Sequence, residues 1–513
     1  MRKAGCFSIA IVLWIVCLAG SAPVRGQDPA GTQPASAATH EAAGQAGHGG
    51  HAVPAGHANL TAPSLLAAIP FVVMLLSIAI LPLVPATAHW WHHNRNKLIV
   101  ALTLAAVTVV YYLLRGSGIH FDHHGFEAGL PTVKAVLHHA VLADYVPFIV
   151  LLFSLYTISG GIQLRGDLRA SPMVNTAFLG VGALLASFVG TTGASMLLIR
   201  PLLQTNRERN HVTHTVIFFI FLVSNIGGCL LPIGDPPLFL GYLKGVPFLW
   251  TFRLWVEWAF CVGVLLAVYY VWDTIMFRKE TPLAHRLDDT QLEPLRVHGK
   301  LNFLWLLGVV LAVALIVPGQ KLIGTGITIP EHGYVREAVM LGLVLLAWLT
   351  TSPAIRAGNQ FDFFAITEVA ALFIGIFITM QAPIEYLRIR GADLHVGQPW
   401  QFFWVTGTLS SFLDNAPTYL VFFAIANALT HAPGEGIIRL MDGNFIRESQ
   451  LVAISLGAVF MGANTYIGNG PNFMVKSIAE QSGVKMPSFF GYMLYSIGIL
   501  VPLFVLVTFL FIH

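Results

Sequence analysis

The sequence predicts an all-α polytopic membrane protein composed of two inverted repeats. Each repeat is expected to contain five transmembrane helices, one of them broken, and one re-entrant hairpin. The 513 residues are 56% hydrophobic and only 10% charged, and the mean hydropathy is +0.71. Apolar runs long enough to cross a bilayer recur almost to the last residue. Two of these runs, one in each half of the chain, are interrupted by Gly, Pro, Asn and Asp.

The interrupted runs are SNIGGCLLPIGDPPLFLGYL at 224–243 and MGANTYIGNGPNFMV at 461–475. A bilayer offers no water to backbone amides, so unwound backbone persists at membrane depth only where protein or a water-filled cavity surrounds it. Paired broken helices in the two halves of a chain mark the substrate and ion site of secondary transporters. The two interruptions therefore predict one site that both halves share.

The first 63 residues are expected to lie outside the helical body. Residues 1–26 have the pattern of a secretory signal peptide, with Arg2 and Lys3 ahead of an apolar run; an uncleaved anchor helix is the alternative. Residues 27–63 form a Gly-, Ala- and Pro-rich tract with several histidines, expected to be periplasmic and disordered. Weak metal capture is the functional interpretation of those histidines. The four cysteines imply no disulfide framework.

Apolar windows of membrane length predict ten spans and two hairpins. The spans are expected at 64–84, 98–114, 145–164, 214–243, 247–277, 301–317, 338–351, 365–387, 451–475 and 489–510. The hairpins are expected at 174–203, interrupted at SFVGTTGAS, and at 400–429, interrupted at SSFLDNAPTYL. With the N-terminus outside, the inward loops hold more Lys and Arg than the outward loops, as the positive-inside rule requires.

Under this assignment the transmembrane part divides into repeats at 64–290 and 291–513. Each repeat has three spans, a hairpin, a broken span and a closing span, so it crosses the membrane an odd number of times and the second repeat enters inverted. Ser187-Phe188-Val189-Gly190-Thr191 in the first hairpin aligns with Ser411-Phe412-Leu413-Asp414-Asn415 in the second. The hairpin tips are therefore expected to meet near the midplane, beside the interruptions. Chance similarity of two Ser-Phe pairs is the alternative.

Two carboxylates lie in these otherwise apolar surroundings. Placing one at the centre of a membrane helix costs about 2.5–3.5 kcal/mol, so such residues usually face a polar cavity. Small hard cations prefer oxygen ligands from carboxylates, amides, hydroxyls and backbone carbonyls. The predicted ion- and proton-binding residues are Thr191, Thr192, Ser224, Asn225, Asp235, Asp414, Asn415, Asn464, Thr465 and Asn469. A proton and a cation can compete for one such carboxylate, and that competition is sufficient for exchange.

Helix capping is the structural alternative for both carboxylates. Asp235 precedes Pro236, and Asp before Pro is a strong helix-start pattern. Asp414 precedes Asn415-Ala416-Pro417, where the same alternative applies. Residues expected to set backbone geometry or act as hinges at the interruptions are Gly227, Gly228, Gly234, Gly468, Gly470 and Pro417.

Two further groups of ionisable residues have less specific patterns. Glu368 begins the span ITEVAALFIGIF and is either a third titrating group or an interfacial charge favoured by the helix dipole. The outward stretch at 120–144 holds five histidines and three carboxylates. These side chains could bind a transition metal or titrate near neutrality, but a hydrated loop without fixed geometry is the preferred interpretation, and no metal site is predicted.

SNIGGCLLPIGDPP resembles the Ser-Asn-x-Gly-Gly-x-x-x-Pro-Ile-Gly-Asp signature of NhaD-type sodium:proton antiporters in the ion transporter superfamily. YVPFIVLLFSLYTISGGIQL, EVAALFIGIFITM and LDNAPTYLVFF are similar to the bacterial group that includes citrate-transporter-like proteins and sodium:proton antiporters. The resemblance covers residues 64 to 513. The matched positions are Ser224, Asn225, Gly227, Gly228, Pro232, Gly234, Asp235, Asp414 and Asn415.

The resemblance implies two inverted repeats, hairpins that contribute to ion binding, and a homodimer in which a scaffold domain holds a mobile transport domain. One departure concerns the first hairpin, which is acidic in NhaD-type antiporters and is Gly190-Thr191-Thr192 in this chain. The ion stoichiometry and the use of sodium therefore stay open at this point.

The leading interpretation is a secondary active transporter of the bacterial inner membrane that exchanges a cation, Na⁺, for protons, without any cofactor. The alternative is a sodium- or proton-coupled transporter of citrate or a dicarboxylate, because half-helix N-termini can hold anions. Intramembrane aspartyl proteolysis is disfavoured because Pro232 stands where that motif has Gly and its Tyr-Asp partner is missing, so no enzyme activity is expected. The net charge of +3 does not indicate nucleic acid, since Lys and Arg in such a chain mainly set orientation.

Overall fold

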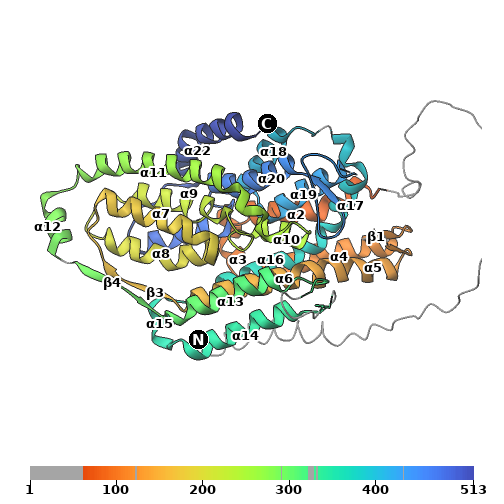
Figure 1. Ribbon diagram of the computed structural model, residues 1–513, viewed down its shortest axis with the longest axis horizontal. Coiled ribbons are helices and arrows are strands. Elements are labelled where there is room, and N and C mark those ends of the chain that lie inside the picture. Colours follow the sequence, from red (N-terminus) through yellow and green to blue (C-terminus); the bar gives the residue numbers. More distant parts are fainter. Residues whose placement is uncertain are drawn as a thin grey trace, which may run out of the picture.

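The computed structural model describes residues 62–512 except 122–123, 291, 322–327, 331–332, 395 and 431. The signal peptide and nearly all of the His-rich tract lie outside these residues, as do Asp122 and His123 of the outward His-rich stretch. The described chain is mostly helical, and its elements follow one another as a compact set of long, apolar helices (Figure 1).

The first half of the chain contains helices and short strands in the following order. They are η1 (Leu65–Ala68), α2 (Ile69–Ile80), α3 (Pro85–Trp91), α4 (Asn94–Leu114), β1 (Ile119–Phe121), β2 (His124–Phe126), α5 (Leu130–Leu137), η2 (His138–Tyr145), α6 (Val146–Ser159), β3 (Gln163–Asp167), α7 (Pro172–Val189), α8 (Thr191–Thr205), α9 (Thr213–Leu222), η3 (Ile226–Cys229), α10 (Pro236–Leu243), η4 (Phe248–Leu254), α11 (Trp255–Phe277) and α12 (Pro282–Thr290).

The second half begins with a strand and continues with helices. Its elements are β4 (Glu293–His298), α13 (Leu301–Leu315), α14 (Val335–Thr350), α15 (Pro353–Gly358), α16 (Phe364–Thr379), α17 (Gln381–Arg390), η5 (Gly391–Leu394), α18 (Pro399–Phe412), α19 (Asn415–Ala428), β5 (Ile437–Arg439), β6 (Phe445–Arg447), α20 (Glu448–Met461), η6 (Gly462–Asn464), α21 (Gly470–Gln481) and α22 (Phe489–Phe511).

Every predicted span and hairpin coincides with helices of the structure. Among the described residues, six helices are long and apolar enough to cross a membrane, or seven if the bent pair Leu65–Ile80 and Pro85–Trp91 is one span. This confirms an all-α polytopic membrane protein. The span expected at 145–164 differs, because α5, η2 and α6 form one continuous helix from Leu130 to Ser159 and Leu164 belongs to β3. A π-helical turn at η2 carries the helix through the histidines that composition assigned to a loop.

The two predicted hairpins are pairs of helices that meet at a sharp turn. The first joins α7 to α8 through Gly190, whose φ of 79° is open to glycine but strained for other residues. The second joins α18 to α19 through Leu413 and Asp414. The two interrupted spans are α9–η3–α10 and α20–η6–α21, in which a short 3₁₀ turn and extended backbone separate two helices.

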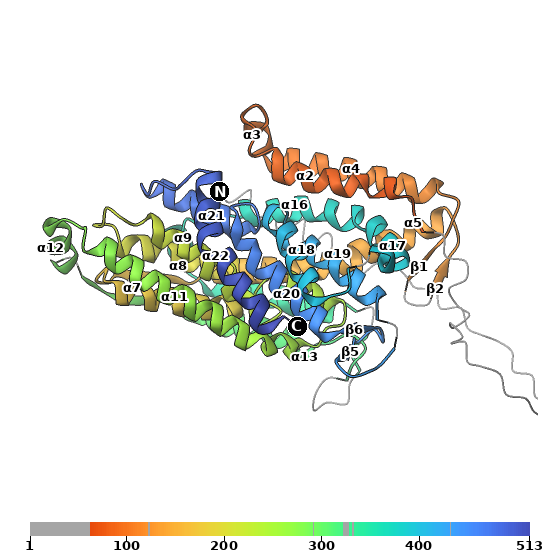
Figure 2. The same ribbon diagram turned by 90° about the horizontal axis from the view of Figure 1, so that it is seen from above.

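The helices pack in layers, and the outermost helices expose much of their surface. In Figure 2, α2 and α4 form a layer along one side, with α16 beneath them and α3 bent away at the end. Inside the body, 78% of the most apolar stretch of Leu130–Ser159 is buried, against 28% for α22. Outer helices expose large apolar side chains, such as Phe490 and Phe509 of α22, both 75% exposed. Lipid is the environment that accepts such a surface.

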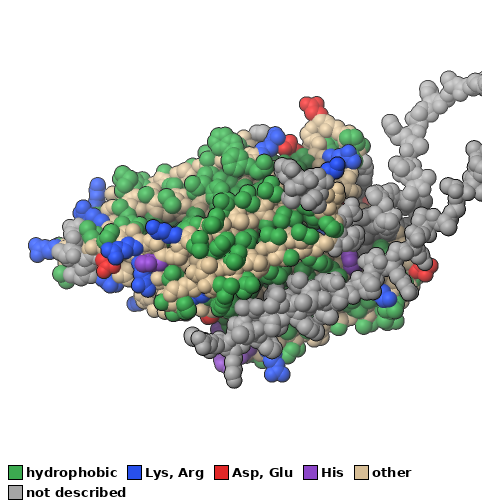
Figure 3. Space-filling model, turned by 60° about the horizontal axis from the view of Figure 1, so that its bottom comes forward, with side chains coloured by type: hydrophobic (Ala, Val, Ile, Leu, Met, Phe, Trp, Pro, Cys, Tyr) green, Lys and Arg blue, Asp and Glu red, His purple; other side chains and the backbone are tan. Residues whose placement is uncertain are grey.

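Charged side chains are sparse on the central surface of one face of the body (Figure 3). Figure 3 shows hydrophobic side chains over the central part of one face, with Lys and Arg gathered at the end that carries α12 in Figure 1. A central apolar band bounded by charge is typical of a membrane-embedded protein.

Three short two-stranded antiparallel sheets were not expected from the sequence. One of them pairs β3 with β4, joining Gln163 to His298 and Leu164 to Val297 across the predicted boundary near residue 290. Because β3 follows α6 and β4 precedes α13, this ribbon ties the two halves together at one end of the body (Figure 1).

A buried ion network fixes the link between α8 and α9 to the end of α11. Arg209 donates to Asp273 with Nη2 at 2.6 Å and Nη1 at 3.1 Å, and its Nε lies 3.8 Å from Glu280. The His214 Nε2 is 2.8 Å from Asp273 Oδ1. All four side chains are buried, so the charges are stable only as a group.

We expect Asp273→Asn to destabilise the protein, because it leaves the Arg209 guanidinium buried beside only one carboxylate. Breaking a buried pair costs about 3–5 kcal/mol, which should lower the apparent melting temperature of the detergent-purified protein clearly. Asp393→Asn is the matched control, since Asp393 pairs with Arg390 at the surface and is 63% exposed. Equal melting temperatures for the two variants would show that the Asp273 network does not stabilise the protein.

Candidate functional site

The two interrupted spans and the two hairpin tips meet at one place inside the body. The backbone N–H of Thr191, at the tip of the first hairpin, donates to Gly234 O at 2.8 Å. Asn415, at the tip of the second hairpin, and Asn469, in the second interruption, both donate to Asp235 in the first. Four helices, α8, α10, α19 and α21, therefore begin around one carboxylate.

Asp235 is at the centre of this group and is 1% exposed. Its Oδ1 accepts hydrogen bonds from Thr191 Oγ1 at 2.9 Å and Asn469 Nδ2 at 3.1 Å, and its Oδ2 accepts one from Asn415 Nδ2 at 2.6 Å. Among the described residues, no Lys, Arg or His nitrogen lies within 4.0 Å of this carboxylate. The carboxylate is buried with neutral donors and without a counter-ion.

The capping interpretation of Asp235 is wrong. Asp235 occupies the N-cap position of α10, but its side chain makes no capping hydrogen bond. Extended backbone, with φ −141° and ψ 142°, turns the side chain toward the hairpin tips instead. Pro236 at the first helical position lacks an N–H, so the helix start needs less from a cap.

Asp414 behaves in the opposite way. Its carboxylate accepts a hydrogen bond from Ala416 N at 3.1 Å and thereby caps α19. The side chain is half-buried at the hairpin tip and has no ion-pair partner among the described residues. Asp414 therefore makes the capping hydrogen bond that Asp235 lacks.

Asparagine side chains extend the site into a connected network. Asn469 Nδ2 lies 3.2 Å from Ser224 O and 3.3 Å from Asn225 Oδ1. Asn225 Nδ2 donates to Asn472 Oδ1 at 2.7 Å, and Asn472 Nδ2 donates to the carbonyls of Gly462 and Thr465, each at 2.9 Å. These amides satisfy carbonyls that the interrupted helices leave unpaired, which keeps unwound backbone stable inside the protein.

Two amide oxygens in this region have no hydrogen-bond partner among the described residues. They are Asn415 Oδ1, beside Asp235, and Asn464 Oδ1, in the second interruption. Asn415 is fully buried. A buried amide oxygen normally has a partner, so these acceptors are available to a bound cation or proton donor.

The other predicted ligands take supporting positions. Ser224 Oγ lies 2.9 Å from Ser195 Oγ on α8. Thr465 donates to Ser411 O and accepts from Gly468 N at 3.2 Å. Asn464 Nδ2 donates to Ser411 Oγ at 2.9 Å, which ties the second interruption to the second hairpin.

Two predicted ligands lie apart from this group. Thr192 is half-buried and forms no side-chain hydrogen bond with the described residues. Glu368 on α16 pairs with the buried Lys97 of α4 at 2.7 Å, and α16 packs against α4, η2 and α2 rather than against the helix starts. The structure thus places Glu368 in an ion pair with Lys97, outside the Asp235 group.

Close packing explains four of the predicted glycines. A Cβ on Gly234 would collide with Gly228 O, and one on Gly468 would lie 2.5 Å from Gly462 O. Gly227 and Gly228 are equally crowded, whereas a Cβ on Gly470 would meet nothing within 4 Å. None of these has positive φ, so space and not backbone freedom requires glycine. Pro417 is buried in the first turn of α19, where its missing N–H costs nothing.

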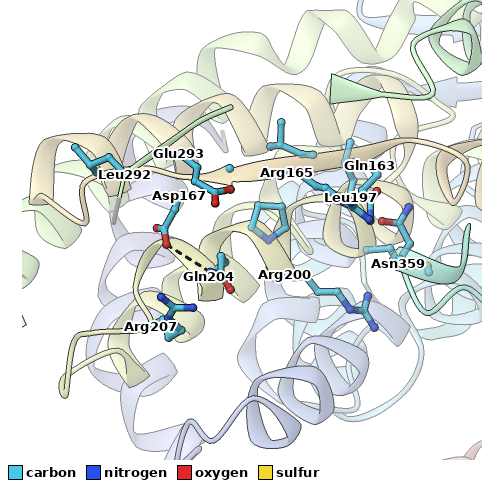
Figure 4. Close-up of a pocket in the computed structure, with 15 residues that line it drawn as sticks. Gln163, Arg165, Asp167, Leu197, Arg200, Gln204, Arg207, Leu292, Glu293 and Asn359 are labelled. Carbon is cyan, nitrogen blue, oxygen red and sulfur yellow. Dashed lines mark hydrogen bonds between the residues drawn. The ribbon is translucent and has the colours of Figure 1, made fainter. Parts of the chain in front are cut away.

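The sequence interpretation missed a polar cavity at the far end of α8. It has a volume of about 680 Å³ and is lined by residues of β3, α8, β4 and α15 (Figure 4). Figure 4 shows Arg200, Gln204 and Arg207 along one edge, with Gln204 Nε2 donating to Asp167 at 3.4 Å. Burial and the neighbouring Glu208 carboxylate raise the pKa of Asp167. Arg200 and Gln204 are four residues apart on α8 and share one helical face, and Arg207 follows the end of the helix; this spacing was the signal in the sequence.

We expect Gly468→Ala to lower the stability of the protein and Gly470→Ala to leave it nearly unchanged. The first substitution forces the second interruption away from Gly462 and Ser410, at a cost of about 1–3 kcal/mol. The second adds a methyl group in open space at the start of α21. Melting temperatures of the two purified variants, two residues apart, measure the difference, and a stable Gly468→Ala protein would contradict the packing argument.

Comparison with known proteins agrees with this architecture. The model of a protein family described as "putative citrate transport" matches residues 60–512 of the chain. Two similar proteins are uncharacterized transporters of Mycobacterium bovis and Mycobacterium tuberculosis, each 24% identical over 419 residues that cover 76% of this chain and 87% of the relative. The family match includes both hairpins and both interruptions. The chain therefore belongs to the family that this model describes, and it is a multi-pass membrane transporter rather than an enzyme.

Proposed function

We propose that this transporter exchanges a small monovalent cation, Na⁺, for protons at Asp235. The observation that carries the proposal is a fully buried carboxylate without a cationic partner, bonded to Asn415, whose own Oδ1 lacks a partner among the described residues. An ionised carboxylate is costly in such surroundings unless a positive charge accompanies it. A proton or a metal cation can each remove that cost, but both cannot occupy the same oxygen.

The composition of the group favours a monovalent ion. Asp235 is the only ionisable side chain in the hydrogen-bonded network of Thr191, Asn415 and Asn469, so a bound Na⁺ would make the group neutral. Hydroxyl and amide oxygens are suitable ligands for a hard cation. In the described part of the chain, no cluster of three or more His, Cys, Asp or Glu side chains could hold a transition metal.

Inverted repeats are part of the proposal, and matched bonds in the two halves support them. Ile233-Gly234-Asp235 corresponds to Ile467-Gly468-Asn469, and Asp235 and Asn469 have nearly the same backbone angles. Ser187 Oγ donates to Gly227 O in the first half, and Ser411 Oγ donates to Met461 O, 234 residues after Gly227, in the second. Thr191 and Asn415, at equivalent hairpin positions, both donate to Asp235.

The inverted arrangement leads to a proposal for the membrane topology and location of the protein. We propose ten spans and two re-entrant hairpins in the bacterial inner membrane, with both termini outside the cytoplasm and two copies assembled as a dimer. The charged end that carries α12 and the β3–β4 ribbon is then cytoplasmic, in agreement with the positive-inside rule.

Transport of citrate or a dicarboxylate is the second candidate. Four helix N-termini around Asp235 present partial positive charge, which favours anionic groups, and the family description refers to citrate transport. The buried Asp235 carboxylate would repel such a substrate unless a proton or cation neutralised it first. Coupled ion binding is therefore a requirement of either function.

We expect Asp235→Asn to abolish cation/proton exchange, because the amide keeps the size of the side chain but can neither lose a proton nor pair with Na⁺. Asp414→Asn is the matched variant: Asn caps helices about as well as Asp, so α19 stays intact and exchange should fall far less. Sodium-dependent collapse of a pH gradient in everted vesicles, with and without citrate, measures both.

Membrane abundance of each variant is the control. Near-normal exchange in Asp235→Asn, or complete loss restricted to Asp414→Asn, would transfer the proton-carrying role away from Asp235. A sodium-independent but citrate-dependent pH change in the wild type would favour the second candidate function.

Cysteine labelling tests the topology. Lys485 follows α21 and Arg439 lies in β5, and both side chains are exposed, while the native Cys229 and Cys261 are buried. We expect a membrane-impermeant thiol reagent to label Arg439→Cys in intact cells and Lys485→Cys only after permeabilisation. Labelling of both variants from one side would exclude the proposed inverted arrangement.

A further inference from the structure

A second polar cavity adjoins the one in Figure 4 and shares Arg200, Gln204 and Arg207 with it. It has a volume of about 810 Å³ and lies between the end of α8, Gln360 and the segment that links α21 to α22. Arg200, Arg207, Arg209 and Lys485 all line it, and none of its described lining residues is Asp or Glu. The cavity is large enough for a small organic ligand, and its charged lining is entirely positive.

Arg200 has no carboxylate partner among the described residues. Its Nη2 donates to Gln360 Oε1 at 3.2 Å, whereas its Nη1 is buried and has no hydrogen-bond partner among the described residues. No carboxylate oxygen of the described chain lies within 4.0 Å of its guanidinium. By contrast, Arg209 pairs with Asp273, and Arg207 pairs with Glu208.

Lys485 provides a second positive charge on the wall formed after α21, and it has no ion pair among the described residues. The C-terminal ends of α8 and α21 carry partial negative charge, which accounts for cations that follow them, such as Arg207 and Lys485. It does not account for Arg200, which lies inside α8, five residues before its end, with an unused donor.

We propose that this cavity binds a small di- or tricarboxylate anion, with Arg200 holding one carboxylate and Lys485 a second. A planar guanidinium with a free Nη matches a carboxylate in geometry as well as charge. The amide side chains of Gln204 and Gln481, which also line the cavity, add neutral donors for the remaining oxygens.

This site is separate from Asp235 and does not depend on the proposed exchange. Thr191 begins α8 beside Asp235 and Arg200 is nine residues further along the same helix, which corresponds to about 13 Å at 1.5 Å per residue. α8 and α21 pack against each other, both begin next to Asp235, and both end at this cavity. An anion that joins their far ends would therefore contact two helices of the central site without entering it.

Isothermal titration of the full-length protein in zwitterionic-lipid nanodiscs tests the proposal. Citrate and tricarballylate are the probes, acetate and inorganic phosphate are the comparisons, and a second nanodisc preparation contains anionic lipid. We expect citrate and tricarballylate to bind, Arg200→Gln to weaken binding at least tenfold, and Lys485→Gln to weaken it severalfold. Lys476→Gln is the matched control, because Lys476 is on α21 and pairs with Glu480 outside the cavity.

The Asp235→Asn protein should bind citrate as tightly as the wild type. Unchanged citrate affinity in Arg200→Gln, or loss of citrate binding in Asp235→Asn alone, would place the anion at the central site and overturn the proposal. The proposal would also be overturned if phosphate bound and citrate did not. It would likewise be overturned if anionic lipid in the nanodisc abolished citrate binding, because the cavity would then bind a lipid headgroup. Arg200→Lys keeps the charge and removes the planar fork, so it serves where Arg200→Gln does not fold and should still weaken citrate binding severalfold.

Discussion

The burial of the Asp235 carboxylate is the constraint on which the rest of the structure depends. Three neutral donors, from Thr191, Asn415 and Asn469, each belong to a different element and reach the same two oxygens. Those donors can converge only if two hairpins end, and two helices unwind, at the same depth. The unwound backbone then needs the asparagine network and the crowded glycines to remain stable without water.

The two halves supply the same bonds but different charge. Position 235 holds Asp, and position 469, its counterpart in the proposed repeat, holds Asn; the Asn donates directly to the Asp at 3.1 Å. Two aspartates at this distance would repel each other, and two asparagines would remove the charge. One acid and one amide give a pair that stays bonded while the acid is ionised, and under the proposed inverted repeat only one of the two equivalent positions then carries a charge.

Sequence patterns were sufficient to place the helices, the two hairpins and the two interrupted spans, because bilayer length and helix breakers act locally. They did not distinguish the roles of Asp235 and Asp414: both precede plausible helix starts, and only the tertiary contacts show that one caps and the other does not. Glu368 was ambiguous for the same reason, since its partner Lys97 is 271 positions away. The β3–β4 ribbon and the Arg200 cavity also depend on distant segments and had only weak local signals.

The buried carboxylates of this chain differ in whether a cationic side chain lies beside them. Three carboxylates buried in or next to the helices have a cation at hydrogen-bonding distance: Asp144 with Lys244, Asp273 with Arg209 and Glu337 with Arg336. Asp235 is as deeply buried and has none among the described residues. Asp167 is also buried, with Gln204 Nε2 as its hydrogen-bond partner, but it lines a polar cavity. Asp235 instead lies at the junction of four helix starts with only neutral donors. Under the proposed function, the transported cation or a proton supplies the positive charge that no described residue places beside Asp235.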